Sequence, residues 1–151
     1  MLLSRSAENL YWANRYVERA ETISRLLDVG YRISLLPNYS STHKSEWESI
    51  LLSAGSFDGY RLKYNEFNQK NISDYLLFDN ENKSSVINCM KAARNNIRSA
   101  RTRVTNDVWL SFNQSYKTFQ KYVSTYIFSN SKERHEDGQK NPNYIIWLWR
   151  I

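Results

Sequence analysis

SRSAENLYWANRYVERAETISRLLD, residues 4–28 of this 151-residue chain, carries the clearest sequence evidence of its fold class. At about 100° per residue, its apolar and charged side chains fall on opposite arcs of a helix. We therefore expect a long amphipathic helix with one face buried. The apolar arc consists of Leu10, Ala13, Tyr16, Val17, Ala20, Ile23, Leu27 and Tyr31.

The opposite arc is charged and also carries two aromatic residues. Tyr11 and Trp12 fall on this side. Two large aromatic side chains on a charged arc do not serve solubility, so their position calls for another explanation. The charged members of this arc are Glu8, Arg15, Glu18, Arg19, Glu21 and Arg25.

Neighbouring charges on this arc are partly mismatched. Glu21 and Arg25 form a favourable i,i+4 pair, but Arg15 and Arg19 are like charges at the same spacing. Glu18 and Glu21 are like charges at i,i+3. The pattern predicts partners on another helix, on a ligand or on a second chain, while a charge-rich stripe is also typical of a solvated face.

Shorter elements are expected in the middle of the chain. Residues 45–48, SEWE, have the pattern of a capping box that opens a short helix ending before Gly55. Residues 58–68 are expected to be irregular or briefly helical, and 72–78 to form another short helix.

A basic helix is expected after a loop at residues 79–83, with Ser84 or Ser85 as its cap. No acidic residue occurs from 84 to 106. Such a stripe could pair with the glutamates of the first helix, hold a phosphate or carboxylate, or contact nucleic acid; because the helix lacks aromatic residues for base stacking, nucleic acid is the least favoured. The stripe is Lys91, Arg94, Arg98 and Arg101, beside the apolar stripe Val86, Met90, Ala93, Ile97, Ala100 and Val104.

The last long helix is expected from about Asn106, with an aromatic stripe that we interpret as core rather than as a stacking platform. Three long helices, each with one apolar face, can cover one another as an antiparallel bundle. The predicted fold is therefore all-α, a helical bundle of three long helices plus short connecting helices. The stripe is Trp109, Phe112, Tyr116, Phe119, Val123 and Ile127.

Composition limits the classes of function. A chain that is 41% hydrophobic, with four glycines and two prolines, can form one helical domain with a real core. Cys89 is the single cysteine, and with His43 and His135 far apart the sequence predicts no disulfide, metal site or cofactor. Because Arg5 and Glu8 lie where a signal sequence would be apolar and no long apolar run follows, we expect no membrane segment and a cytoplasmic location.

The segment LLSRSAENLYWANRYVERAETISRLLDV, residues 2–29, resembles the opening of the bacterial alpha-E domain family, LSR-x-AENLYW-xx-RY-x-ERAE-xxx-RLLDV. Several blocks match in order, which is more specific than one short motif, and together they extend over about residues 1–120. The further blocks lie at 46–48, 75–79, 82–98 and 108–109.

The end of the chain departs from this pattern. Residues 129–143 are almost without apolar side chains, and 144–151, YIIWLWRI, are strongly apolar. The resemblance implies family members about twice this length, with a partial repeat of the first-helix motif in the second half. We therefore expect a helical domain at 1–128 and a divergent tail at 129–151, in a truncated or frame-shifted copy.

The resemblance implies that this chain is an accessory protein in peptide synthesis or modification. Its partners would be circularly permuted ATP-grasp proteins and transglutaminase-like peptidases. Arginine would hold carboxylates or phosphates of an anionic ligand, glutamate would take amines or orient the arginine, and the aromatic residues would exclude water. The working face would consist of Glu8, Tyr11, Trp12, Arg15, Glu18, Arg19, Glu21 and Arg25, with Arg94 and Arg98 as candidates to complete it.

Other functions stay open. The domain could be an enzyme in its own right, with Glu18 or Glu21 as general base, although the sequence has no phosphate loop and no Ser-His-Asp or Cys-His set. A net charge of +6 leaves a basic nucleic-acid-binding bundle as a further hypothesis. An oligomer is compatible with the charged face, and a helical domain without chemistry is the simplest alternative.

Overall fold

The computed structural model describes residues 4–35 and 43–132 of the chain. This part contains six α-helices and one 3₁₀ turn and has no strand, which confirms the all-α prediction. The elements are α1 (Ser4–Ser34), α2 (His43–Ser53), α3 (Phe57–Arg61), α4 (Gln69–Leu77), α5 (Val86–Ser99), η1 (Arg101–Arg103) and α6 (Asn106–Lys132).

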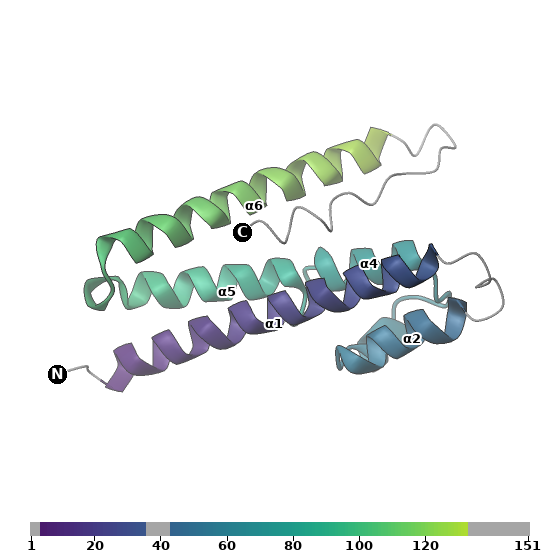
Figure 1. Ribbon diagram of the computed structural model, residues 1–151, viewed down its shortest axis with the longest axis horizontal. Helices are drawn as coiled ribbons and strands as arrows, with labels where there is room; N and C mark the ends of the chain where they lie inside the picture. Colours follow the sequence, from purple (N-terminus) through teal and green to yellow (C-terminus); the bar gives the residue numbers. More distant parts are fainter. Residues whose placement is uncertain (1–3, 36–42, 133–151) are drawn as a thin grey trace.

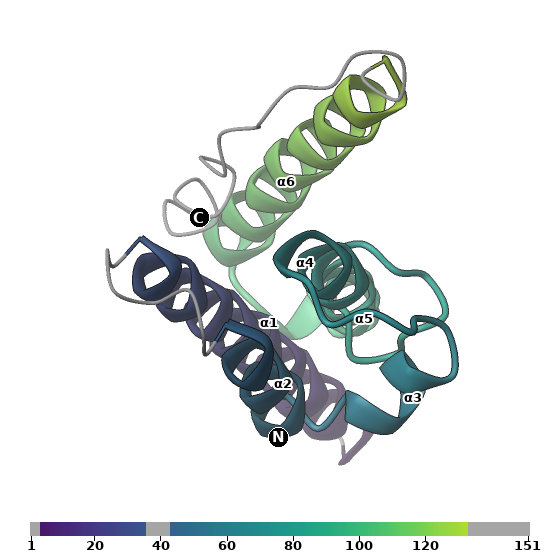
Figure 2. The same ribbon diagram turned by 90° about the vertical axis from the view of Figure 1, so that its right-hand side faces the viewer.

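The long helices form an antiparallel bundle whose middle layer is made of two short helices. Figure 1 shows α4 and α5 in one row between α1 and α6, and the turned view in Figure 2 shows α4 end-on in front of α5. Helix α5 runs against both α1 and α6 (Figure 1). The predicted bundle is confirmed, but its middle row is not one long helix, because α5 has 14 residues and α4 completes the row.

The most extensive contact between helices joins α1 to α5. Both helices bury small side chains, with Ala13 and Ala20 buried on α1 and Cys89, Ala93 and Ala100 buried at or next to α5. Small side chains allow two helix backbones to approach closely. The predicted apolar arc of α1 is confirmed as its inward side, with Leu10, Ala13, Tyr16, Val17, Ala20, Ile23, Leu27 and Tyr31 buried or half-buried.

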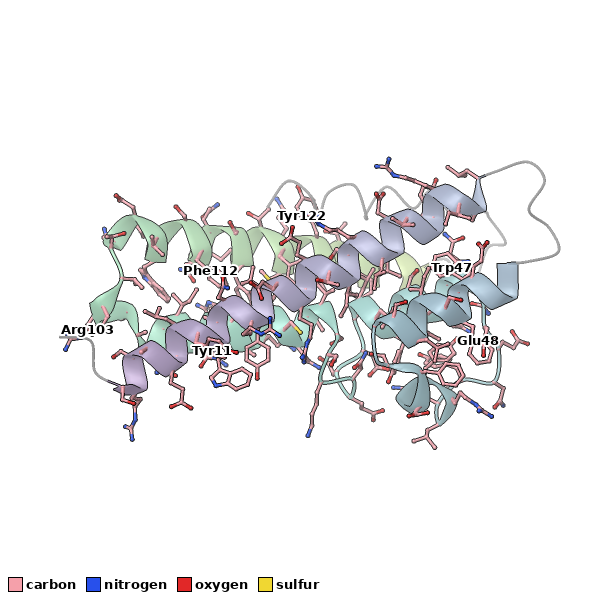
Figure 3. All side chains as sticks on the ribbon, turned by 60° about the horizontal axis from the view of Figure 1, so that its bottom comes forward. Tyr11, Trp47, Glu48, Arg103, Phe112 and Tyr122 are labelled. Carbon is pink, nitrogen blue, oxygen red and sulfur yellow. The ribbon has the colours of Figure 1, made fainter. Side chains whose placement is uncertain are left out.

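Helix α2 packs on the C-terminal half of α1 at a glycine. A Cβ atom at Gly30 would collide with the end of the Ile50 side chain and lie 3.2 Å from the Trp47 ring. Figure 3 shows Trp47 between the two helices. Gly30 is therefore a position where α1 gives room to the Ile50 and Trp47 side chains of α2, and this close packing helps to fix how α2 lies along α1.

The ends of α2 agree only in part with the sequence prediction. The helix ends before Gly55, whose φ of 62° is the left-handed conformation that favours glycine after a helix. It begins at His43 and not after Ser45, so the predicted capping box is wrong about the start. Nothing in residues 43–45 is a glycine or proline that would stop the helix from extending by these residues.

An aromatic cluster closes the end of the bundle where α3 and α4 meet. Tyr60 is fully buried, and its ring centroid lies 4.9 Å from that of Tyr64, 5.5 Å from Phe67 and 5.3 Å from Tyr75. Its hydroxyl donates to the backbone oxygen of Glu66, and burial raises the pKa of Tyr60 to about 12. The segment predicted to be irregular or briefly helical therefore has one short helix and a packed aromatic core.

The loop between α4 and α5 is tied by asparagine side chains. Ser85 caps α5 by accepting a 3.4 Å hydrogen bond from the backbone nitrogen of Asn88. The Asn88 side chain in turn donates to the backbone oxygens of Asn80 and Asn82, each at 2.9 Å. Several positions of the block at 82–98 are therefore explained by loop structure.

Lys63 joins this loop to the segment after α3. Its ammonium group lies 2.7 Å from Asp79 and 3.0 Å from Glu81. Burial acts to raise the pKa of Asp79, but the hydrogen bonds from Lys63 and from the backbone of Glu81 and Asn82 hold it below its usual value.

Helix α6 covers the other side of α5 with its aromatic stripe. Tyr116, Phe119 and Val123 are buried, and Trp109 and Phe112 are half-buried, as expected for core residues. The side chain of Ile127 lies outside the described residues, as does the whole tail from residue 133, so the predicted domain boundary at 128 stays a prediction. Among the described helices, none combines the length and apolarity needed to cross a membrane.

Replacing Gly30 by alanine should destabilise the protein. An alanine at an unconstrained helix position would stabilise by up to about 1 kcal/mol relative to glycine. Here the added methyl group displaces the end of Ile50 and lies 3.2 Å from the Trp47 ring, so we expect a net loss of up to about 2 kcal/mol in the free energy of unfolding, measured by urea denaturation.

Ile50→Val is the matched test of the cause, because valine lacks the δ-carbon that the new methyl group strikes. The loss caused by Gly30→Ala should be smaller in the I50V background. An equal loss in both backgrounds would contradict the proposed packing.

Candidate functional site

The charged arc of α1 is exposed to solvent. All six of its charged residues, and also Tyr11 and Trp12, are exposed. Arg15 lies 2.9 Å from Glu18, and Arg25 pairs with Glu21. The charges therefore partly neutralise one another along α1. Of the two interpretations that the sequence allowed, the exposure of these residues favours a solvated face over a buried one.

Most of this face lines an open pocket of about 500 Å³. The floor is α1, and one wall is the C-terminal end of α2, which Gly30 holds against α1. The sequence alone could not indicate this wall, because Ser53 and Ala54 carry no recognisable chemistry and their position depends on how α2 packs. The lining consists of Arg15, Glu18, Arg19, Glu21, Thr22, Ile23, Arg25, Ser53 and Ala54.

Within the pocket, the glutamate and the arginine at its centre differ in their partners. Glu18 accepts one hydrogen bond from Asn14 at 3.0 Å and another from Arg15 at 2.9 Å, so both carboxylate oxygens are engaged. Arg19 makes no hydrogen bond or ion pair with any residue that the structure describes. It is therefore the pocket cation whose guanidinium group is available to a ligand.

The positive charge of Arg19 also reaches the interior. Burial raises the pKa of the Cys89 thiol, and Arg19 partly opposes this increase. A buried thiol with a raised pKa is poorly suited to act as a nucleophile. Among the described residues, no group of three His, Cys, Asp or Glu side chains could hold a metal ion.

Tyr11 and Trp12 form an exposed aromatic pair on the N-terminal half of α1. Their rings meet edge to face at 5.5 Å between centroids, and Trp12 lies 6.1 Å from Tyr16. Tyr11 is 60% exposed and Trp12 45%. Figure 3 shows Tyr11 on the half of α1 that α2 does not cover, and Glu8 lies one turn nearer the N-terminus.

The structure does not bring Arg94 to this pocket. Its Nε donates to Asn113 on α6 at 3.0 Å, and its guanidinium group lies 4.9 Å from the centre of the Tyr116 ring. Arg94 is therefore part of the contact between α5 and α6. In the sequence, the spacing of Asn113 and Tyr116 places both residues on one face of α6. That spacing is the one signal that could have indicated a polar contact with a residue such as Arg94 on α5.

The rest of the basic stripe is also separate from the charged face of α1. Lys91 donates to Asn80 at 3.1 Å, Arg98 is exposed, and Arg101 lies beyond the end of α5 in η1. The proposed pairing of this stripe with glutamates of the first helix is not found among the described residues, because its inner members bond to asparagines instead.

Arg94→Met should destabilise the protein by about 1 to 2 kcal/mol, because it removes a half-buried hydrogen bond and a cation–π contact while keeping the aliphatic stem. Arg98→Met, one turn later on the same helix, should change the free energy of unfolding by less than about 0.5 kcal/mol. Thermal unfolding of both variants measures the difference, and equal effects would show that Arg94 does not connect α5 to α6.

Comparison with known proteins supports the family relationship. A family model described as a predicted alpha-helical domain with a conserved ER motif matches residues 2–139. No curated protein and no solved structure matches the chain. Glu-Arg occurs in this sequence at Glu18–Arg19 and at Glu133–Arg134, and the first of these lies at the centre of the pocket in α1.

Proposed function

Because the chain belongs to the Alpha-E family, as the resemblance of residues 2–29 suggested, we propose that it is an accessory protein of a system that makes or modifies peptides. In this proposal the α1 pocket binds a carboxylate of the peptide or of the protein that carries it. The partner would be an ATP-grasp or transglutaminase-like protein, and the protein would act in the cytoplasm.

The single observation that carries the proposal is the charge arrangement around Arg19. Arg15 and Arg25 stand on either side of it along α1, each balanced by a glutamate, while Arg19 has no partner among the described residues. A guanidinium group matches a carboxylate through two parallel hydrogen bonds. The pocket, at about 500 Å³, has room for a short peptide end.

Exposed ion pairs of this kind add little to folding stability. Arg15 and Glu18 are 54% and 50% exposed, and pairs so exposed contribute between zero and about 1 kcal/mol. A cluster of five charged residues around one pocket is therefore more easily explained by recognition than by stability.

The enzyme alternative has weaker support. A general base must reach a proton of the substrate and is usually desolvated. Glu18 is half exposed and holds two hydrogen-bond donors, and Glu21 is paired with Arg25. Both groups are better placed to orient arginine than to abstract a proton.

The nucleic-acid alternative rests on the net charge of +6. Two of the four cations of the basic stripe, Lys91 and Arg94, already bond to asparagines of the chain. The stripe is therefore a poor fit to a phosphate backbone, which requires several free cations in line.

Arg19→Gln should weaken binding of a carboxylate ligand. The probe is N-acetyl-dialanine with a free carboxylate, and isothermal titration calorimetry measures its dissociation constant. A lost charge-assisted hydrogen bond corresponds to a rise of about tenfold or more. Arg101→Gln, an exposed arginine outside the pocket, is the control and should leave the constant unchanged. Equal binding of the C-terminal amide of the probe would contradict the proposal.

Glu18→Gln separates the accessory role from catalysis. In a reconstituted system with an ATP-grasp partner, peptide formation by the E18Q variant should persist at no less than about a tenth of the wild-type rate, because glutamine still accepts a hydrogen bond from Arg15. Loss of a general base would cost about 100-fold or more. Such a loss, with partner binding intact, would support the enzyme alternative instead.

A further inference from the structure

The pocket on α1 is open to solvent, and the same helix carries an exposed aromatic pair that the fold does not explain. Tryptophan, tyrosine and arginine are the residue types enriched at the centres of protein interfaces. Tyr11 contacts Trp12, and Trp12 in turn contacts Tyr16, so the pair is held in a defined position before any partner arrives. Two exposed features on one helix therefore need a common explanation.

We propose that two copies of this chain associate through antiparallel α1 helices, so that Tyr11 and Trp12 of each copy cover the open side of the other copy's pocket. The inference rests on the proposed function in one respect, which is that the pocket is the ligand site. In the dimer, each site is completed by residues of both copies.

The argument for a second copy is the charge order along α1. The outward line of the helix, spaced three and four residues apart, consists of Glu8, Tyr11, Arg15, Glu18, Thr22 and Arg25. A two-fold axis level with Tyr16 and Val17 places Glu8 opposite Arg25 of the second copy. The same axis places Arg15 opposite Glu18, so every charge on the line faces its opposite.

Neighbouring registers lack this property. A two-fold axis level with Glu18 would place the Glu18 carboxylates of the two chains opposite each other. An axis level with Arg15 would do the same for the two Arg15 guanidinium groups. Like charges in contact across an interface are strongly unfavourable. The sequence of α1 therefore selects one register for a symmetric pair.

This register also brings the aromatic pair to the pocket. Tyr11, on the outward line, becomes level with Thr22 of the second copy, which lines the pocket. Trp12 precedes Gly30 by about five full helical turns, so both lie on the side of α1 where α2 packs. This two-fold axis places the α2 sides of the two copies on the same side of the dimer. Trp12 of one copy therefore approaches the pocket of the other copy beside the end of that copy's α2.

The test is a charge-reversal series on the full chain, followed by sedimentation equilibrium. Glu8→Arg and Arg25→Glu should each raise the dimer dissociation constant by about tenfold or more, and the double variant E8R/R25E should restore it to within about threefold of wild type. Glu8 and Arg25 lie about 25 Å apart along one helix, so the restoration requires contact between two chains.

The matched control is E8R/K117E, which has the same net charge as E8R/R25E but reverses an exposed lysine on α6. It should remain as weakly associated as E8R alone. A monomeric wild-type protein would overturn the proposal, and so would a double variant E8R/R25E no better than its single variants. Circular dichroism of each variant verifies that the helical fold is kept.

Two further variants separate this inference from the proposed function. Trp12→Ala should weaken both the dimer and the binding of N-acetyl-dialanine, whereas Arg19→Gln should weaken only the peptide. If R19Q leaves peptide binding intact while the charge-reversal series behaves as expected, the ligand assignment fails and the dimer stands. If W12A leaves both dimer and peptide binding unchanged, the aromatic cover is wrong.

Discussion

The close packing of α1 on α5 is the constraint on which the other features depend. Ala13 and Ala20 on one helix, and Cys89 and Ala93 on the other, leave space for the two backbones to approach. Once this inward side of α1 is fixed, the helix can present the Glu18–Arg19 dipeptide only to the outside. Gly30 then determines where α2 lies, and the end of α2 provides the wall of the pocket.

The spacing of residues within one helix was enough to predict features that depend on that helix alone. The buried and exposed arcs of α1, the aromatic side of α6 and the cap at Ser85 all follow from spacing and residue type, and the structure agrees with each of them. The pocket could be predicted only in part, because five of its charged residues share one face of α1 but its wall comes from α2. Arg94 was misassigned for the same reason: its partners, Asn113 and Tyr116, lie on another helix, and no periodicity within α5 identifies them.

The structure also distinguishes charged residues that bond to groups within the fold from charged residues that are exposed in the α1 pocket, a difference that the sequence does not show. Lys63, Lys91 and Arg94 bond to groups within the fold and have a structural explanation. The charges of the α1 pocket are exposed, contribute little to stability, and leave Arg19 without a partner among the described residues. This difference supports the proposal that Glu18 orders the pocket and that Arg19 binds the ligand.

The most direct test of that claim is nuclear magnetic resonance of the arginine side chains, in which each Nε–H group gives its own signal. On addition of N-acetyl-dialanine, we expect a saturable shift of the Arg19 signal, smaller shifts for Arg15 and Arg25, and none for Arg94, which is held by Asn113 on the far side of α5. Saturable shifts at Arg94 or Arg98 with Arg19 unchanged would place the ligand elsewhere and contradict the proposed role of Arg19.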